Sequence, residues 1–382
     1  MAPYLFVLLL AAFVSVYIKL YMPSGIAENK DLQFPQASDT AGDSDVIPVA
    51  GTDVTQEGSS QAQSSSIPSA TTEMYRNMLE ELLKKDTPYT VAECVADKNT
   101  VISLSGDGNV ILSEENNGEI LSFVSAELSV SNSISGIKLS NGISHILSTD
   151  TQNFNNNGAF AENKVLESFI SNINLLYIGN KAFYGCTSLS DVFLHTKLRY
   201  IGDRAFYGCK ALKKIAVFGE TAIGDSAFAG CDSLKEVYLS DSITRVGLGA
   251  FEHTPFYENL TAEFCISGGV LLKYNGNASD VVIPDGVRVI ADGVFAGKLG
   301  IKSVTLPKSV EYIGNSAFRS CVGLTDVFFD RSYAPVIGEY AFEGCPLSEP
   351  LTVSLLASES RRLLVTKNDI KHSDDAEPSA AY

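Results

Sequence analysis

The dipeptide Ala-Phe, replaced once by Val-Phe, recurs through the second half of the chain at nearly constant spacing. Its phenylalanines are Phe160, Phe183, Phe206, Phe228, Phe251, Phe295, Phe318 and Phe342. The intervals between them are 23, 23, 22, 23, 44, 23 and 24 residues, so the fifth interval equals two periods. A repeat of this length predicts a solenoid in which each unit forms one coil and buries its apolar side against the next coil.

The residues around each phenylalanine repeat as well. Four segments read IGNKAFYGCTSLSDVFL (178–194), IGDRAFYGCKALKKIAV (201–217), IGDSAFAGCDSLKEVYL (223–239) and IGNSAFRSCVGLTDVFF (313–329). The spacing Leu-x-x-Val-x-Leu, as in Leu189, Val192 and Leu194, is typical of leucine-rich repeats and predicts one short parallel strand per turn. We expect the phenylalanine to fill the turn opposite, and Ile-Gly before it to supply a core contact and a permissive backbone turn.

The consensus IGxxAFxGCxxLxxVxL resembles the BspA-type leucine-rich repeat of surface proteins from bacteria and some protist parasites. The resemblance implies an α/β-type repeat solenoid over residues 156–353, with short helical or 3-10 turns on its convex side. Residues 250–260 and 268–287 also resemble a hairpin-bearing unit of such proteins, which explains the doubled interval. Because Asn275-Gly276 suits a two-residue turn, we expect an extra, protruding β-hairpin near 263–277.

Two segments precede the folded part of the chain. Residues 1–22 contain fifteen consecutive uncharged residues, which fit either a cleaved signal peptide or a retained single-pass anchor. Residues 23–72 are rich in Ser, Thr, Gln and Asp and poor in aromatic residues, so we expect a disordered stalk.

The remaining flanks differ in character. Residues 73–155 should hold a capping helix and irregular, β-rich, degenerate repeats, and residues 354–382 a polar tail. The helix is predicted by apolar residues on two adjoining rows, namely Met74, Tyr75, Met78, Leu79, Leu82 and Leu83. One degenerate repeat is predicted by residues in the family's order, namely Ile134, Ile137, Leu139, Ile143 and Ile146. We expect the helix to cover the exposed first coil, because solenoid ends need a polar-backed cap.

Charge and composition argue against several functions. The chain has 28 Lys and Arg against 45 Asp and Glu, a net charge of −17 with no basic cluster, which disfavours nucleic acid and anionic lipid as partners. It has four histidines, no tryptophan and none of the common catalytic or nucleotide-binding motifs. We therefore expect no enzyme activity, no cofactor and no metal site.

Five of the seven cysteines occupy one position of the repeat. They are Cys186, Cys209, Cys231, Cys321 and Cys345. Side chains at equivalent positions of neighbouring coils point in parallel, which is a poor orientation for a disulfide. We expect a ladder of buried free thiols.

Residues between the apolar strand positions should project from the concave sheet and include several aromatic and acidic side chains. The candidate ligand-binding residues are Asp191, Phe193, His195, Glu236, Tyr238, Asp326 and Phe328. Exposed aromatic rings on a rigid sheet suit a binding face, although β-propensity alone also favours them there. The expected hairpin, with Tyr274 and Asn275, is a second candidate.

These features predict a non-catalytic, cell-surface or secreted protein. The resemblance implies adhesion or recognition of an extracellular protein or glycan through the concave face, with membrane attachment through residues 1–22 if they are uncleaved. A membrane-tethered intracellular scaffold is the alternative, because Lys19 follows the apolar run and would place the repeats inside the cell. Asn259 and Asn277 lie in glycosylation sequons that matter only in a glycosylating host.

Overall fold

The computed structural model describes residues 88–113, 115–116, 119–147, 158–329, 335–347, 351–355 and 362–365. The predictions for residues 1–22 and 23–72 and for the capping helix concern residues outside this part of the chain. None of the described residues belongs to a helix that is both long and apolar enough to cross a membrane.

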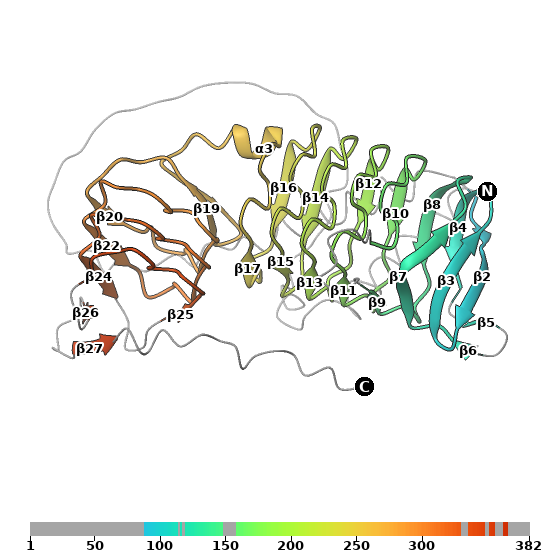
Figure 1. Ribbon diagram of the computed structural model, residues 1–382, viewed down its shortest axis with the longest axis horizontal. Helices are drawn as coiled ribbons and strands as arrows, with labels where there is room; N and C mark the ends of the chain where they lie inside the picture. Colours follow the sequence, from blue (N-terminus) through green and yellow to red (C-terminus); the bar gives the residue numbers. More distant parts are fainter. Residues whose placement is uncertain are drawn as a thin grey trace, which may run out of the picture. The chain divides into compact units, whose positions relative to one another are not determined.

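The described chain is a leucine-rich repeat β-solenoid of about ten turns with parallel strands (Figure 1). Each regular coil contributes a longer strand from its Leu-x-x-Val-x-Leu segment. These strands are β8 (Ile134–Leu139), β10 (Ser168–Ile170), β12 (Asp191–Phe193), β14 (Lys214–Val217), β16 (Glu236–Leu239), β20 (Asp280–Val282), β22 (Ser303–Leu306) and β24 (Asp326–Phe329). We call the side of the solenoid that they form the long-strand side.

Each coil also contributes a second, two-residue strand, which the sequence did not lead us to expect. These strands are β9 (His145–Ile146), β11 (Tyr177–Ile178), β13 (Tyr200–Ile201), β15 (Ala222–Ile223), β17 (Arg245–Val246), β21 (Val289–Ile290), β23 (Tyr312–Ile313) and β25 (Val336–Ile337). They pair in parallel with their neighbours and form the short-strand side. The prediction of one strand per turn was therefore incomplete. The residues before Ile-Gly are extended too, and stacking gives their backbone groups partners in the next coil.

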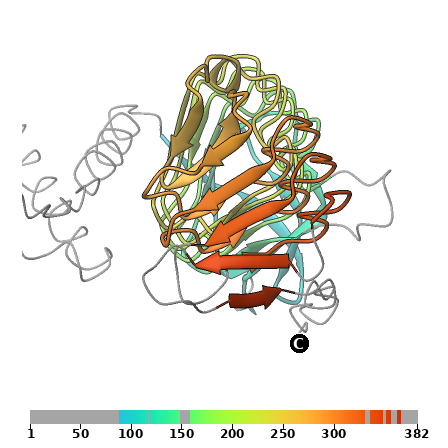
Figure 2. The same ribbon diagram turned by 90° about the vertical axis from the view of Figure 1, so that its left-hand side faces the viewer.

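The long strands form three separate ladders. In the first, β12, β10 and β8 are joined in parallel, followed by β4 (Gly108–Leu112) and β1 (Thr90–Val91). The second contains only β14 and β16, and the third runs from β20 through β22 and β24. The third ladder continues into the hairpin β26 (Leu351–Leu355) and β27 (Arg362–Val365), so the sheet extends past residue 353. Figure 2 shows these last strands at the end of the solenoid.

The degenerate repeat before residue 156 is part of the same solenoid. Ile134, Ile137 and Ile146 are buried in the core that contains the regular repeats. Strands β8 and β9 pair in parallel with β10 and β11 of the first regular coil. The edge beyond them is completed by β2 (Glu93–Asp97), β3 (Thr100–Ser105), β5 (Glu115–Asn116), β6 (Glu119–Ile120) and β7 (Phe123–Val130).

The phenylalanines stack face to face along the core. Centroid distances between successive rings from Phe160 to Phe251 are 5.0, 5.0, 5.1 and 5.4 Å. From Phe295 to Phe342 they are 4.7 and 5.2 Å. Between these two runs Tyr274 packs on Phe295 at 4.9 Å, so a tyrosine takes part in the stack where the repeat's phenylalanine is missing.

The turns around the phenylalanines are not helical, contrary to expectation. Backbone hydrogen bonds there join residues three apart, as from Ala182 N to Gly179 O and from Cys186 N to Phe183 O. Positive φ angles, 57° at Lys181 and 67° at Gly185, interrupt each run and prevent a helix. Within the described residues the one helix is α3 (Pro255–Glu258), capped by Thr254.

The doubled repeat contains the expected hairpin, but its turn and position differ from the prediction. Strands β18 (Phe264–Ser267) and β19 (Val270–Tyr274) are joined through Gly268 and Gly269, at φ 54° and 69°, and not through Asn275-Gly276. A Cβ on Gly268 would lie 2.3 Å from Leu239 O, so the turn packs directly on the end of β16. Since β19 also pairs with β21, the hairpin is integrated into the solenoid and does not protrude.

Candidate functional site

The predicted binding residues lie on the outward face of the long-strand side. In β16, Val237 and Leu239 are buried while Glu236 and Tyr238 are exposed. The same alternation places Asp326 and Phe328 outward on β24. Side chains that alternate along a strand point to opposite faces of the sheet, so one set builds the core and the other forms a surface.

These residues are not one continuous strip. Asp191 pairs in register with Ser168, Glu236 with Lys214, and Asp326 with Ser303, each within a different ladder. The structure therefore brings together Glu236 with Tyr238, and Asp326 with Phe328, but leaves these pairs in separate sheets. The second candidate is excluded as an exposed contact at one residue, because Tyr274 is only 2% exposed.

Exposure differs sharply along the outward row. Phe193 is 2% exposed, whereas Tyr238 is 38% exposed. Beside Phe193, the half-buried His195 lies edge-on at 5.0 Å between ring centroids and accepts a bond to its backbone nitrogen's hydrogen from no ring atom; that N–H donates to Ser171 Oγ at 2.9 Å. Burial, with a smaller effect of the Lys138 charge, lowers the pKa of His195 to about 4. The imidazole is thus neutral at neutral pH.

The exposed pairs are held by hydrogen bonds to neighbouring side chains. Tyr238 Oη donates to Glu236 Oε2 at 3.1 Å, and partial burial with this carboxylate raises the pKa of Tyr238. On β24, Thr325 Oγ1 donates to Asp326 Oδ2 at 2.8 Å. Each pair therefore presents an aromatic ring and a carboxylate on a rigid strand.

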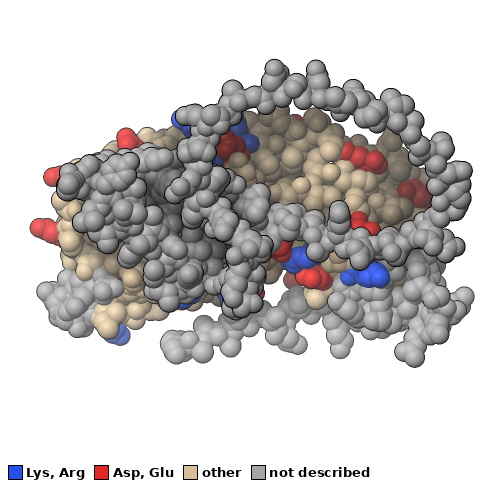
Figure 3. All heavy atoms as spheres, turned by 180° about the vertical axis from the view of Figure 1, so that it is seen from behind, with Lys and Arg blue, Asp and Glu red and all other residues tan. Residues whose placement is uncertain are grey.

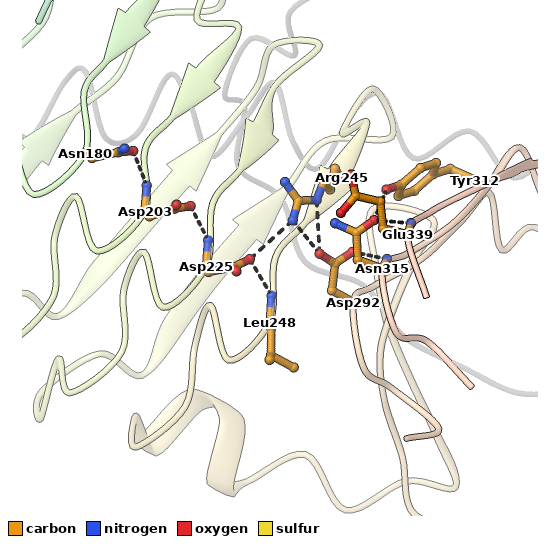
Figure 4. Close-up of polar contacts among 9 residues, drawn as sticks. All are labelled: Asn180, Asp203, Asp225, Arg245, Leu248, Asp292, Tyr312, Asn315 and Glu339. Carbon is orange, nitrogen blue, oxygen red and sulfur yellow. Dashed lines mark hydrogen bonds and ion pairs between the residues drawn. The ribbon is translucent and has the colours of Figure 1, made fainter. Parts of the chain in front are cut away.

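A polar ladder that sequence reasoning missed runs along the solenoid directly after each Ile-Gly. Asn180 Oδ1 accepts from Asp203 N at 2.8 Å, and Asp203 Oδ1 accepts from Asp225 N at 2.8 Å (Figure 4). The same bond joins Asp292 Oδ1 to Asn315 N at 2.8 Å in the later coils. The signal was present in the sequence, because Asn or Asp follows Ile-Gly in all four quoted repeats.

This ladder also explains the glycine of Ile-Gly. A Cβ on Gly224 would lie 2.4 Å from Asp203 Oδ1, and one on Gly314 would lie 2.5 Å from Asp292 Oδ1. Neither glycine has a positive φ, so the conserved feature of these positions within the repeat is close approach and not a special turn. The expectation of a permissive backbone turn is corrected accordingly.

The ladder is interrupted at Leu248, which has no side-chain oxygen, and Arg245 bridges the gap. Its Nη2 lies 3.3 Å from Asp225 Oδ1 and 2.6 Å from Asp292 Oδ2, and its Nε lies 3.0 Å from Asp292 Oδ2 (Figure 4). The Asp292 side chain is only 2% exposed. Burial raises the pKa of Asp292, an effect that the Arg245 guanidinium opposes. Arg245 thus links the coils before and after the hairpin unit.

A second aromatic row lies on the short-strand side. His145 stacks on Tyr177 at 4.8 Å and contacts Phe123 at 5.3 Å, and Tyr177 lies 6.3 Å from Tyr200. Burial raises the pKa of Tyr200 to about 12 and lowers that of His145. Because successive rings cover one another's faces, this row offers mostly ring edges to a partner.

The cysteine ladder has a backbone partner in each coil. All seven thiols are free, and five donate to the carbonyl of the phenylalanine one coil earlier. The Sγ to O distances are 3.0 Å for Cys186, 3.2 Å for Cys209, 3.1 Å for Cys231, 3.1 Å for Cys321 and 3.0 Å for Cys345. Burial raises the pKa of Cys186 to about 12, which keeps this thiol protonated and unreactive.

The described surface shows no concentration of one chemistry. Within the described residues no group of three or more His, Cys, Asp or Glu is placed to hold a metal ion. On the face drawn in Figure 3, Lys and Arg lie beside Asp and Glu and do not gather into a basic patch. The ion pairs Arg199–Glu220 and Lys210–Asp232 are examples of such neighbours.

Two parallel strands per coil, a stacked phenylalanine core and a period near 23 residues define a leucine-rich repeat solenoid. The model of the BspA type leucine rich repeat region matches residues 152–264 and 271–358, in six copies. These residues make up more than half of the chain. The protein therefore belongs to the BspA-type leucine-rich repeat family.

Several solved structures are similar to the chain at low identity. A leucine-rich repeat protein from Bacteroides ovatus is 20% identical, over 68% of this chain and 79% of that one, with a TM-score of 0.33. A leucine rich cell surface protein from Faecalibacterium prausnitzii is 18% identical, over 66% and 78%, with a TM-score of 0.27. The pneumococcal vaccine antigen PcpA is 18% identical, over 68% and 70%, with a TM-score of 0.27. No curated protein matches the chain.

Proposed function

We propose that this leucine-rich repeat protein is a non-catalytic recognition protein of the cell surface, exported or anchored through residues 1–22. Its partner is an extracellular protein or glycan, bound on the outward face of the long-strand side. Family membership supports an extended interaction surface, and the composition of residues 23–72 supports a stalk that holds the solenoid away from a membrane.

One observation carries the proposal most directly. Tyr238 is 38% exposed on a rigid strand, and its hydroxyl is held by the exposed Glu236 at 3.1 Å. Asp326 and Phe328 repeat this combination of carboxylate and ring on β24. Aromatic rings fixed on a sheet provide contact area at little cost in conformational entropy, and tyrosine is enriched at binding hot spots.

The location is tested by protease treatment of intact cells, followed by mass spectrometry of the released peptides and of the mature N-terminus. Release of repeat peptides from intact cells is the expected result. Protection of the repeats until lysis would overturn export and favour a membrane-tethered intracellular scaffold, the reading that the position of Lys19 supports.

The binding face is tested with the purified full chain on a glycan array and on an array of purified extracellular proteins. The double variant Tyr238→Ser with Phe328→Ser should lose the binding that the wild-type chain shows. Leu299→Ser serves as the matched control, because Leu299 is 66% exposed in a turn away from these strands. Equal binding by the wild-type chain and the double variant would refute the assignment of this face.

A further inference from the structure

Three apolar side chains on the outward face of the long-strand side are buried without belonging to the core. Ile170, Phe193 and Ala216 are 7%, 2% and 1% exposed, yet none of them is a member of either core cluster. Their strand neighbours Phe169, Val192 and Ile215 fill the core instead. Since alternate residues of a strand point to opposite faces, these three side chains lie under a cover on the outer surface.

The covered area has sharp limits. In the same outward row, Lys138 on β8 is exposed on one side, and Tyr238 on β16 is 38% exposed on the other. The cover therefore spans β10, β12 and β14. Three strands at a spacing of about 4.8 Å occupy roughly 10–14 Å, which matches the ~10 Å diameter of a single α-helix.

The chain itself contains a segment with the required character and position. Residues 74–83 carry the two adjoining rows of apolar side chains described above. This segment leads into β1 at Thr90, and β1 forms the edge of the same ladder that contains β10 and β12. From β1 to β10 is three strand spacings, roughly 14 Å, and the six residues from 84 to 89 can span about 20 Å when extended.

We propose that residues 74–83 form an amphipathic helix that lies across the outward face of β10, β12 and β14 and covers Ile170, Phe193 and Ala216. Its apolar rows replace water on these side chains, while its charged residues face solvent. This position differs from a cap on the first coil, which the sequence alone suggested. The inference is independent of the proposed function, but it divides the candidate binding face: Phe193 is occupied from within the chain, and Tyr238 and Phe328 are left for a partner.

The test uses the absence of tryptophan from the chain. Phe193→Trp places a single indole in the covered patch, and Ile170→Trp provides a second reporter in case the first variant fails to fold. In the otherwise unchanged full chain, the indole should emit at short wavelength and resist quenching by acrylamide. Val282→Trp is the matched control, because Val282 lies in the same outward row and is 64% exposed.

The segment is then altered in the reporter chain. Leu79→Asp with Leu82→Asp should shift the emission to longer wavelength and raise quenching to the level of the Val282→Trp control. Asn77→Asp with Lys84→Gln makes the same change of two charges on the polar rows and should leave the emission unchanged. The proposal is wrong if the indole is already accessible in the unaltered chain. It is equally wrong if the indole stays shielded in the Leu79→Asp, Leu82→Asp chain while circular dichroism shows an intact, cooperatively melting solenoid.

Discussion

Replacing Arg245 with methionine should destabilise the solenoid at the junction between the coils before and after the hairpin unit. The substitution keeps an unbranched apolar stem but removes the guanidinium that joins Asp225 to Asp292. The Asp292 carboxylate, only 2% exposed, would then lack a cation while keeping the hydrogen bond from Asn315 N at 2.8 Å. An uncompensated buried charge is the physical cause of the expected loss.

The magnitude follows from the burial of the two partners. Breaking a buried ion pair by removing one partner costs about 3–5 kcal/mol. The Arg245 side chain is 28% exposed and the Asn315 N–H remains, so the loss should lie near the lower limit, about 3 kcal/mol. For a folded unit of this size such a loss lowers the melting temperature by roughly 6–12 °C.

Urea denaturation followed by circular dichroism, at pH 7 and at pH 4.5, measures the effect and its pH dependence. Burial already raises the pKa of Asp292 in the folded protein, and removing Arg245 raises it further. A group whose pKa is higher in the folded state favours folding below its unfolded pKa and loses that contribution as pH rises through the folded value. The deficit of Arg245→Met should therefore be full at pH 7 and smaller at pH 4.5.

Two further variants decide whether the reasoning holds. Arg288→Met is the matched control, because Arg288 occupies the equivalent position one coil later and pairs with Glu311, which is 57% exposed; its loss should be below about 1 kcal/mol. Asp292→Asn in the Arg245→Met background should restore most of the stability, since Asn keeps the ladder acceptor, as at Asn180 and Asn315. A deficit equal to that of Arg288→Met, or one that does not change with pH, would refute the role of the buried pair.

Two other predictions concern the core and the covered patch. Phe206→Ala removes a ring stacked at 5.0 and 5.1 Å between its neighbours and should cost about 3–5 kcal/mol in thermal unfolding; an unchanged melting temperature would show that this ring is not in the core. His195 has a folded pKa of about 4, below its ordinary value of 6.5, so its contribution is present above pH 6.5 and is lost as pH falls toward 4. His195→Gln should remove that loss, at most about 3 kcal/mol and less because the ring is only half-buried, and urea unfolding at pH 7 and pH 4.5 would contradict this if both chains lost the same stability.

Short-range sequence patterns determined the repeat fold of this protein. The Ala-Phe period, the Leu-x-x-Val-x-Leu spacing and the single position of five cysteines each depend on residues within one coil, and each coil has the same environment. Leu189, Phe206 and Cys209 are all fully buried, as their places in the repeat indicate. A pattern that recurs in every coil can be interpreted without knowing how distant segments meet.

The hairpin shows where local preference was overridden. Asn275-Gly276 has the better turn sequence, but the chain turns at Gly268-Gly269 because that turn must pass within contact of the Leu239 carbonyl, where no Cβ fits. Tyr274 is then drawn into the phenylalanine stack on Phe295, and the residue proposed as an exposed contact becomes part of the core.

The sequence by itself determined the coil, its core and the face on which Phe193 and Tyr238 lie. Only the tertiary structure decided that Phe193 is buried and Tyr238 exposed, and that Arg245 replaces the missing ladder oxygen at Leu248 by reaching a carboxylate 47 residues away. Equivalent repeat positions have the same backbone and the same orientation, but their exposure and their ion pairs depend on which distant segment packs above them. That is a property of the folded chain, which a local pattern does not encode.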